Sequence, residues 1–298
     1  MNEYKANGRR SLVDLKMRLN NHILPVFGPR RAAAITTAMM TKFTTDRQEA
    51  GATNAEINRE LAAIKRAFSL AMKGGKILWK PFIPMLEENN VRKGFFERRQ
   101  FEWVRGNLPE DLQAMVTFAY ITGWRIPSEV LTLQWPQVDF AAGVVRLEPG
   151  TTKNDEGREF PLTAELRELL EAQRAKAEAL KREGIICPWV FHRAGHPIRT
   201  YRRSWISACK KAGLPGRIPH DFRRTAVRNL VRAGIPERVA MTMTGHKTRS
   251  VFERYNIVSC GDLMEAAKKL DEVRRLGIAA EDKGQLVTEN CSSMLRAK

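Results

Sequence analysis

Cysteine is scarce in this sequence: four of 298 residues, at positions 187, 209, 260 and 291, without a C-x-x-C pair. This spacing excludes a disulfide framework and a cysteine-based zinc site, and it is typical of a reducing cytoplasm. Long hydrophobic runs are also lacking, because no segment reaches the ~18 apolar residues of a membrane helix. The first residues, MNEYKANGRRSLVDLKM, contain no apolar core of a signal peptide. Neither a secreted nor a membrane-spanning protein is therefore expected.

Acidic residues are few relative to basic ones, with 33 Asp+Glu against 51 Lys+Arg, and the formal net charge is +18. Such an excess attracts polyanions, of which nucleic acid is the commonest. A basic protein without a polyanionic partner is the alternative. Both the first 90 residues and the remainder are basic, which suits a protein that grips a duplex from two sides.

The length suffices for two domains, each with its own core. Residues 1–85 predict a small helical domain, with an apolar stripe at positions 12, 15, 19, 23 and 24. Its clearest helix starts at Thr53, which has capping-box spacing to Glu56, and apolar residues follow at 57, 61, 64 and 68 before Gly74-Gly75. Residues 86–100 are polar and lack a clean period, and we expect a linker there.

Residues 101–276 combine helices with short strands. Helical segments are expected over 109–122, 128–133 and 166–182, and again toward residue 276. Strands are expected over 138–140, 144–147, 159–162 and 188–191, with a hairpin loop before the third. The predicted fold class is therefore α+β and mostly helical: a small all-α domain, then a mixed α/β domain with a small antiparallel sheet. Residues 277–298 are expected to be a flexible tail.

Four separated segments of the second domain carry candidate catalytic residues. They read TGWRIPSEVLTLQW, TTKNDEGREFPL, PHDFRRTAVRNL and GHKTRSVFERY. The side chains singled out in them are Arg125, Lys153, His220, Arg223, His246 and Tyr255. His220 and Arg223 stand at i and i+3 and so share one face of a helical turn, whose start offers free N–H groups to a phosphate.

This set of side chains suits phosphodiester chemistry without a metal, because no carboxylate cluster with metal-ligand spacing accompanies it. Two guanidiniums match the negative charge on the non-bridging oxygens of a phosphate. A tyrosine hydroxyl can attack phosphorus, although ionising it at pH 7 costs roughly 4 kcal/mol unless a base or cations assist. A loop lysine can protonate the leaving oxygen. Each residue also has an ordinary alternative, as a solvated charge, a helix cap or core.

The combination resembles the tyrosine recombinases of the phage integrase type. The first box of that family stands here as TGWR at 122–125, then Glu129, LQW at 133–135 and VD at 138–139. The second box stands as H-x-x-R at 220–223 and GH at 245–246, with a tyrosine nine residues after that histidine. The lysine of the family's hairpin matches Lys153. The likeness spans nearly the whole chain, as a core-binding domain over 1–85 and a catalytic domain over 101–276.

The resemblance implies a role for each residue. Tyr255 attacks the scissile phosphate, which leaves a 3′-phosphotyrosyl enzyme and a free 5′-hydroxyl. Arg125 and Arg223 bind the non-bridging oxygens, and Lys153 is the general acid. His220 is the general base, and His246 donates a hydrogen bond to the phosphate. Neither ATP nor a metal or other cofactor is implied, because the covalent intermediate conserves the bond energy.

The implied partners are double-stranded DNA at specific attachment sites and three further copies of the chain in a synaptic homotetramer. Residues 262–276 are expected to form a helix that docks on a neighbouring protomer. Accessory directionality or DNA-bending proteins are candidate further partners, no membrane is involved, and the location is the cytoplasm, on the nucleoid. The activity is integration and excision of a phage or other mobile element. A type IB topoisomerase-like relaxing enzyme and a DNA-binding relative without catalysis are the alternatives.

Two departures from the family pattern bear on these expectations. The acidic residue of the first box usually follows its arginine by three positions, but Ser128 stands there and Glu129 comes one later, so the supporting role of Glu129 is less firmly implied. Many phage integrases also carry an N-terminal arm-binding domain. About ten residues precede the first expected helix here, so that domain is either absent from the protein or missing from this chain.

The helical domain offers its own candidates for DNA contact. Arg59, Arg66 and Lys73 lie off the apolar stripe of the helix that starts at Thr53, and their side chains suit phosphates or base edges in a groove. An ordinary solvated helix face is an equally good interpretation of these three residues.

Overall fold

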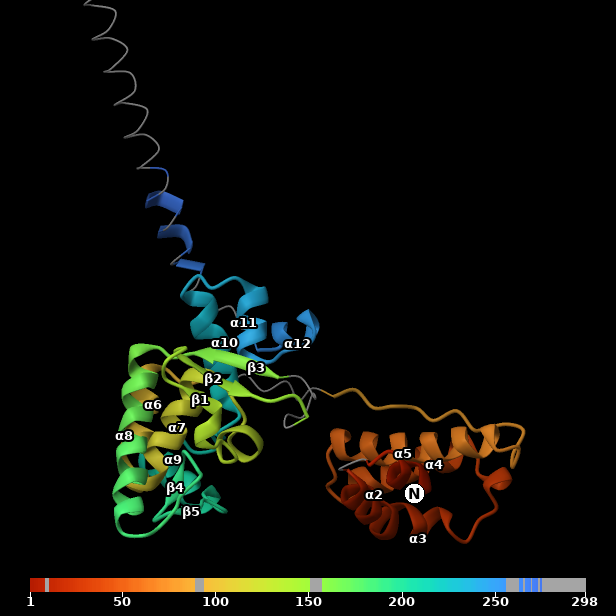
Figure 1. Ribbon diagram of the computed structural model, residues 1–298. Coiled ribbons are helices and arrows are strands. Elements are labelled where there is room, and N and C mark those ends of the chain that lie inside the picture. Colours follow the sequence, from red (N-terminus) through yellow and green to blue (C-terminus); the bar gives the residue numbers. More distant parts are fainter. Residues whose placement is uncertain are drawn as a thin grey trace, which may run out of the picture. The chain divides into compact units, whose positions relative to one another are not determined.

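The computed structural model describes residues 1–8, 11–88, 94–150 and 157–255, together with helical positions between 263 and 274. The chain forms two compact units, Met1–Arg92 and Lys93–Lys298 (Figure 1). We refer to them as the first and second unit. In the part of the chain that the structure describes, no helix combines the length and the apolar character needed to cross a lipid bilayer.

In the described residues of the first unit, all regular secondary structure is helical. Its elements are α1 (Asn2–Ala6), α2 (Leu12–Arg18), η1 (Leu19–Ile23), α3 (Leu24–Phe27), η2 (Ala32–Ala34), α4 (Thr37–Glu49) and α5 (Asn54–Lys73). Helix α5 begins as predicted, because the Thr53 hydroxyl accepts the backbone N–H of Glu56 and the Glu56 carboxylate accepts that of Thr53. The four expected apolar residues of α5 are buried: Ile57, Leu61, Ile64 and Phe68.

The apolar stripe expected near the start of the chain is only partly confirmed. Leu15 and Ile23 are buried, whereas Leu24 is 49% exposed. The reason is the π-helical segment η1, which places one more residue in its turn than an α-helix does. The helix surface is thereby rotated, and Phe27 rather than Leu24 packs into the core of the first unit.

The second unit combines helices with two small antiparallel sheets. Its elements are α6 (Arg98–Gly106), α7 (Glu110–Thr122), η3 (Ile126–Val130), η4 (Trp135–Gln137), β1 (Val138–Asp139), β2 (Val144–Leu147), β3 (Arg158–Pro161), α8 (Ala164–Arg182), β4 (His192–Arg193), β5 (His196–Pro197), α9 (Arg202–Lys211), α10 (Asp221–Arg232), α11 (Glu237–Thr244) and α12 (Arg249–Glu253). The first sheet has the order β1-β2-β3, and β4 pairs with β5. The predicted α+β class is confirmed.

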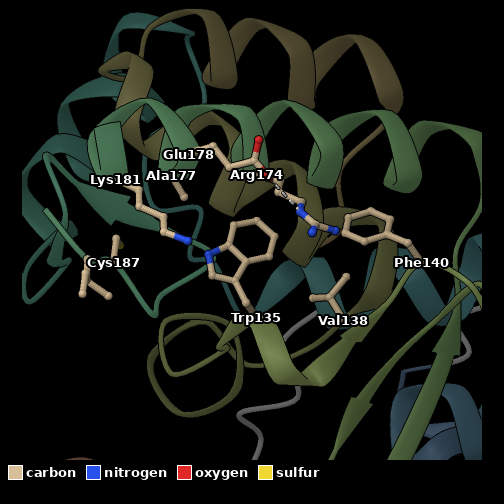
Figure 2. Close-up of a pocket in the computed structure, with 9 residues that line it drawn as sticks. Trp135, Val138, Phe140, Arg174, Ala177, Glu178, Lys181 and Cys187 are labelled. Atoms are coloured by element: carbon tan, nitrogen blue, oxygen red, sulfur yellow. Dashed lines mark hydrogen bonds and ion pairs between the residues drawn. The ribbon is translucent and has the colours of Figure 1, made fainter. Parts of the chain in front are cut away.

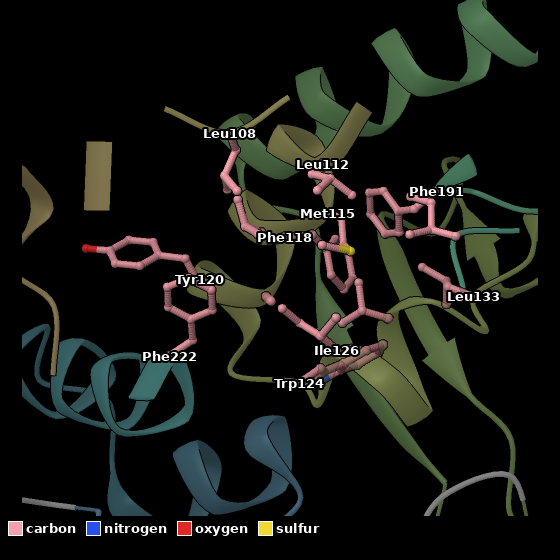
Figure 3. Packing of buried hydrophobic residues seen from close by; sticks show 14 of the residues in the cluster. Leu108, Leu112, Met115, Phe118, Tyr120, Trp124, Ile126, Leu133, Phe191 and Phe222 are labelled. Atoms are coloured by element: carbon pink, nitrogen blue, oxygen red, sulfur yellow. The ribbon is translucent and has the colours of Figure 1, made fainter. Parts of the chain in front are cut away.

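Helix α7 lies at the centre of the second unit, in contact with α6, α8, α10 and η3 (Figure 1). Five of its apolar side chains are fully buried, and they point in several directions: Leu112, Met115, Val116, Phe118 and Ala119. A helix that is apolar on most sides is stable only when it is enclosed in this way. Aromatic rings from neighbouring segments, among them Trp124, Phe191 and Phe222, complete the packing (Figure 3).

The first three predicted strands agree with the structure to within about a residue at each end, but the strand predicted over 188–191 is wrong. Trp189 makes only an isolated bridge to Gln134, and the hairpin comes later, where His192 pairs with Pro197. The turn fixes this register, because Ala194 and Gly195 both have positive φ angles, as a tight two-residue hairpin requires. The apolar residues before it are buried in the core instead.

The second unit begins inside the segment expected to be a linker. Phe96 is fully buried, and its backbone N–H donates to the Thr225 hydroxyl at 2.9 Å. Helix α6 starts at Arg98, where the segment is too short and too charged to reveal an apolar period. At the other end of the expected linker, the backbone of Leu86 exchanges hydrogen bonds with the Asn58 side chain of the first unit. The roles assigned to the two units stay predictions.

Candidate active site

The site starts where α7 ends, at Gly123. This residue has a φ of 69°, in the left-handed region, and a Cβ there would lie 2.8 Å from the Cβ of Ala226 on α10. Only glycine therefore allows α7 to end against α10. The carbonyl of Gly123 accepts a hydrogen bond from Nη1 of Arg223 at 3.1 Å. The turn that carries Arg125 is thus fastened directly to the next expected site residue.

The extra residue between Arg125 and its acidic partner is accommodated by a π-helical turn, η3. The N–H of Val130 donates to the carbonyl of Arg125 at 3.1 Å, five positions back. A π-turn holds one more residue than an α-turn. Glu129 thereby reaches Arg125 from four positions away: its carboxylate accepts the backbone N–H of Arg125 at 2.8 Å and a side-chain N–H of the same residue.

Glu129 is completely buried, and it is shared by a second guanidinium. Nη2 of Arg158, at the start of β3, donates to the same carboxylate oxygen as Nη1 of Arg125. Burial alone would raise the pKa of Glu129, but the positive charge of Arg158 and the bonds from Arg125 outweigh it and hold the pKa below its usual value. Glu129 is therefore an ionised carboxylate that fixes two arginines.

Arg158 is a site residue that the sequence interpretation missed. Its side chain is 4% exposed, and Nη1 donates to the carbonyl of Thr244 at 2.8 Å. A Cβ on Gly245 would lie 2.2 Å from Nη1 of Arg158, so this contact requires glycine there. One available signal was the alternation in β3, which places Arg158 on the same face as the buried Phe160.

Helix α10 supplies the second half of the site. His220 is its N-cap residue, as expected. Arg223, one turn later, is buried and makes three hydrogen bonds: Nη1 to Gly123, Nη2 to the Gly245 carbonyl at 3.2 Å and Nε to Nε2 of His246 at 3.1 Å. A guanidinium has five N–H groups. Two N–H groups of Arg223, one on each Nη, therefore remain for a ligand.

His246 is buried at the end of α11, next to Arg223. Burial and the positive charges of Arg223, Arg125 and Arg158 lower the pKa of His246 to about 3. The imidazole is therefore neutral at physiological pH. Burial and the nearby charge of Arg125 also lower the pKa of Arg223. Of the three guanidiniums, Arg125 and Arg158 pair with the carboxylate of Glu129 and Arg223 does not. The surplus positive charge favours an anion at this site.

Tyr255 follows α12, and its hydroxyl faces the expected base. The Tyr255 Oη lies 3.1 Å from Nε2 of His220, and its ring centroid lies 4.8 Å from that of His246. The ring also packs against a small cluster of Val227, Ala240 and Phe252. The phenol therefore combines an apolar support for its ring with a hydroxyl held by a histidine.

The structure brings together six of the residues singled out from sequence: Arg125, Glu129, His220, Arg223, His246 and Tyr255. Lys153 lies outside the described residues. Arg59, Arg66 and Lys73 are exposed on α5 of the first unit. Arg66 differs from the other two, because it forms an ion pair with Glu3.

A pocket elsewhere in the second unit is separate from this cluster. It measures about 360 Å³ and lies between α8 and the start of the first sheet, with Trp135, Phe140 and Lys181 among its lining residues (Figure 2). None of the cluster residues lines it. Among the residues that the structure describes, no group of three His, Cys, Asp or Glu side chains is placed to hold a metal ion.

The cleavage rate is expected to fall on the acid side only below pH 6.5, the ordinary histidine value. Partial desolvation of its imidazole, together with the charges of Arg223, Arg224 and Arg125, lowers the pKa of His220, although the residue as a whole is exposed. The family resemblance implies that His220 accepts the proton of Tyr255, which a protonated His220 cannot do. Cleavage is then expected above this lowered pKa and lost as pH falls through it. A single-turnover pH–rate profile measures the effect. His220→Asn should remove the acid limb and slow cleavage ~10²–10⁴-fold; an unchanged acid limb in this variant would contradict the assignment.

Comparison with known proteins identifies the family. The model of the phage integrase family matches residues 101–260. The integrase of Salmonella phage P22 is 26% identical over 271 residues, which cover 88% of this chain and 64% of that protein. The ICEBs1 integrase of Bacillus subtilis (strain 168) is 24% identical over 280 residues, which cover 86% of this chain and 76% of the relative. This chain thus matches less than two thirds of the length of the P22 protein.

Solved structures agree with the fold. A lambda integrase dimer bound to a COC′ core site superposes with a TM-score of 0.68 at 18% identity, over 84% of this chain and 72% of that one. The Tn1549 transposon integrase in complex with circular intermediate DNA superposes with a TM-score of 0.69 at 18% identity, over 90% of this chain and 96% of that one. Because the family model covers more than half of the sequence, these findings lead to one conclusion. The chain belongs to the phage integrase family of tyrosine recombinases.

Proposed function

We propose that this chain is a site-specific DNA recombinase, which cuts and rejoins DNA through a covalent 3′-phosphotyrosyl intermediate. One observation carries the proposal: the Tyr255 hydroxyl is held 3.1 Å from a histidine nitrogen, in a cluster with three guanidiniums and one buried carboxylate. Such a cluster attracts a phosphate and presents a nucleophile to it. Integration and excision of a phage or other mobile element is the corresponding biological activity.

In the proposed reaction the Tyr255 Oη forms a bond to phosphorus as its proton passes to Nε2 of His220. The bond from phosphorus to the 5′-oxygen breaks, and Lys153 is the proposed donor of the proton that this oxygen takes up. Arg125 and Arg223 neutralise the non-bridging oxygens, which is typically worth ~10²–10³ in rate for each electrostatic stabiliser. The 5′-hydroxyl of a second strand then attacks the phosphotyrosine and releases Tyr255, so the phosphodiester bonds broken and formed balance.

The proposed partners are double-stranded DNA at attachment sites and further copies of this chain. Lambda integrase, which has the same fold, was solved as a dimer bound to a core site and as a tetramer bound to a Holliday junction. We infer a homotetramer in the synaptic complex, with accessory directionality or DNA-bending proteins as further candidates. A protein with this substrate acts where the DNA is, on the nucleoid in the cytoplasm.

The first unit is proposed to bind the core-site DNA through α5. Binding should weaken steeply with salt, on the order of 10³-fold or more between 50 and 200 mM, because several phosphate contacts release counterions. Arg59→Gln should lower the slope of log K against log salt by about 1. Arg66→Gln should lower it less, because Glu3 already neutralises that guanidinium. Fluorescence anisotropy with a labelled duplex measures the affinity of each variant as a function of salt concentration. A wild-type affinity that does not change with salt would contradict binding through phosphate contacts.

The proposed function is tested with nicked suicide duplexes made from the junctions of the encoding element. Release of the short fragment beyond the nick traps the covalent intermediate, which appears as a protein–DNA adduct on a denaturing gel. Tryptic peptides of the adduct should carry the nucleotide on Tyr255. Absence of any adduct would favour the non-catalytic alternative. Relaxation of supercoils without exchange between two marked duplexes would favour the topoisomerase-like alternative.

A further inference from the structure

The hydrogen bonds around His246 define which of its nitrogens carries the proton. Nε of Arg223 lies 3.1 Å from Nε2 of His246 and donates to it. A guanidinium has no lone pair to offer, so Nε2 must be the unprotonated nitrogen. A doubly protonated imidazole would place two N–H groups against each other, so the geometry also excludes the charged form. The remaining proton of His246 therefore resides on Nδ1.

Thr244 is the residue that receives this proton. Its Oγ1 lies 2.7 Å from Nδ1 of His246 and 2.6 Å from the carbonyl of Ala240, one helical turn earlier. The carbonyl can only accept, so the hydroxyl donates to Ala240 and accepts from His246. A directed chain results, from Arg223 through His246 and Thr244 to Ala240. Thr244 and Ala240 are fully buried, so no water is at hand to replace a missing partner.

The chain has a consequence for Arg223. The Nε–H of Arg223 donates to His246, and one N–H on each Nη donates to a backbone carbonyl. These three hydrogen bonds fix the guanidinium plane. The two free N–H groups are thereby held in a fixed direction. If His246 adopted the other tautomer, its Nε2–H would face the Nε–H of Arg223, and this plane would lose one of its three supports.

We propose that Thr244 is a positioning residue, whose hydroxyl holds His246 in the Nδ1–H tautomer and through it orients Arg223. The inference rests on the proposed function only in giving Arg223 a phosphate to bind. In the DNA-free protein, Nε2 of His246 accepts a hydrogen bond. The role implied by the family resemblance, in which His246 donates to the phosphate, would require the Thr244 hydroxyl to turn from Ala240 toward Nδ1 and Arg223 to release Nε2.

The test uses Thr244→Val, which keeps the branched shape and removes the hydroxyl, and Thr244→Ser, which restores it. Thr117→Val is the matched control, because Thr117 also donates to a carbonyl four residues back, from a buried site on α7 without a histidine. Long-range ¹H–¹⁵N correlation spectra of the DNA-free protein report the tautomer of His246. His246→Gln identifies the resonance among the five histidines.

We expect a single Nδ1–H tautomer in the wild type, the Thr244→Ser variant and the Thr117→Val variant, and its loss in Thr244→Val. Single-turnover cleavage should slow ~10- to 100-fold in Thr244→Val, the effect of one buried unsatisfied N–H, and recover in Thr244→Ser. An unchanged Nδ1–H tautomer in Thr244→Val, or the other tautomer in the wild type, would overturn the proposal. Failure of the wild type to cleave DNA would instead count against the proposed function, because the spectra do not depend on activity.

Discussion

Tyr255→Phe is expected to abolish covalent capture of DNA while leaving DNA affinity within about twofold. The substitution removes one oxygen, which is the atom that would bond to phosphorus. The ring remains supported by Val227, Ala240 and Phe252. The lost hydroxyl contact is with His220, an exposed residue, so the free energy of unfolding should change by less than about 1 kcal/mol. The loss of activity thus isolates chemistry from folding and from binding.

The measurement is the yield of adduct on a nicked suicide duplex, with affinity measured on the same DNA. Tyr201→Phe is the matched control, because Tyr201 packs against the main core of the second unit, away from the cluster. It should form adduct at the wild-type rate. Equal adduct from Tyr255→Phe would refute the assignment of the nucleophile. Loss of adduct in both variants would mean that removing a tyrosine hydroxyl elsewhere in the unit also stops the reaction, so the result with Tyr255→Phe would not identify the nucleophile.

The site could be predicted from sequence as far as local patterns reach. The capping box at Thr53, the glycine that ends α7 and the position of His220 at the start of α10 are all determined by neighbours within a few residues. Such patterns also indicate which segments carry candidate chemistry. They do not give distances between segments, and the convergence of Arg125, Arg223 and Tyr255 depends on how α7 and α10 pack.

Features that depend on distant partners could not be predicted. The alternation in β3 places Arg158 on the buried face, but that pattern does not show the carboxylate that allows a guanidinium to be buried there, which belongs to Glu129, 29 positions earlier. The π-turn at η3 follows no apolar period, so the offset of Glu129 from the family pattern left its supporting role less firmly implied, and the contact with Arg125 could not be foreseen. The tautomer of His246 is determined by Arg223 and Thr244, which belong to two different helices.

Arg158→Met is expected to cost roughly 3–5 kcal/mol of the free energy of unfolding, the usual effect of removing one partner of a buried ion pair. Methionine fills a similar volume but leaves Glu129 with one guanidinium instead of two. The bond to the Thr244 carbonyl, which ties β3 to the end of α11, is lost as well. Cleavage should therefore fall even in conditions where the variant is folded, because Glu129 no longer holds Arg125 from a fixed position.

Urea denaturation gives the size of the effect, and Arg146→Met is the matched control. Arg146 lies on β2 of the same sheet and pairs with Asp139 and Glu159, but it is 39% exposed. Exposed ion pairs contribute about 0–1 kcal/mol, so the control should lose no more than that. A loss in Arg158→Met as small as in Arg146→Met would contradict the view that the buried pair holds the site together.

The pH dependence separates loss of charge from loss of packing. In the wild type the pKa of Glu129 is lowered, so its ionised form adds stability above the unfolded-state pKa, and this contribution is lost as pH falls through the folded-state value. Without Arg158, burial dominates and the pKa of Glu129 should rise. The loss of unfolding free energy caused by Arg158→Met should therefore be smaller at acid pH, where Glu129 is protonated in both proteins.

Adding Glu129→Gln to the Arg158→Met variant should recover part of this lost free energy, because the buried negative charge is then removed. If the loss of unfolding free energy does not change with pH, and if the losses of Arg158→Met and Glu129→Gln simply add, Arg158 acts through packing alone.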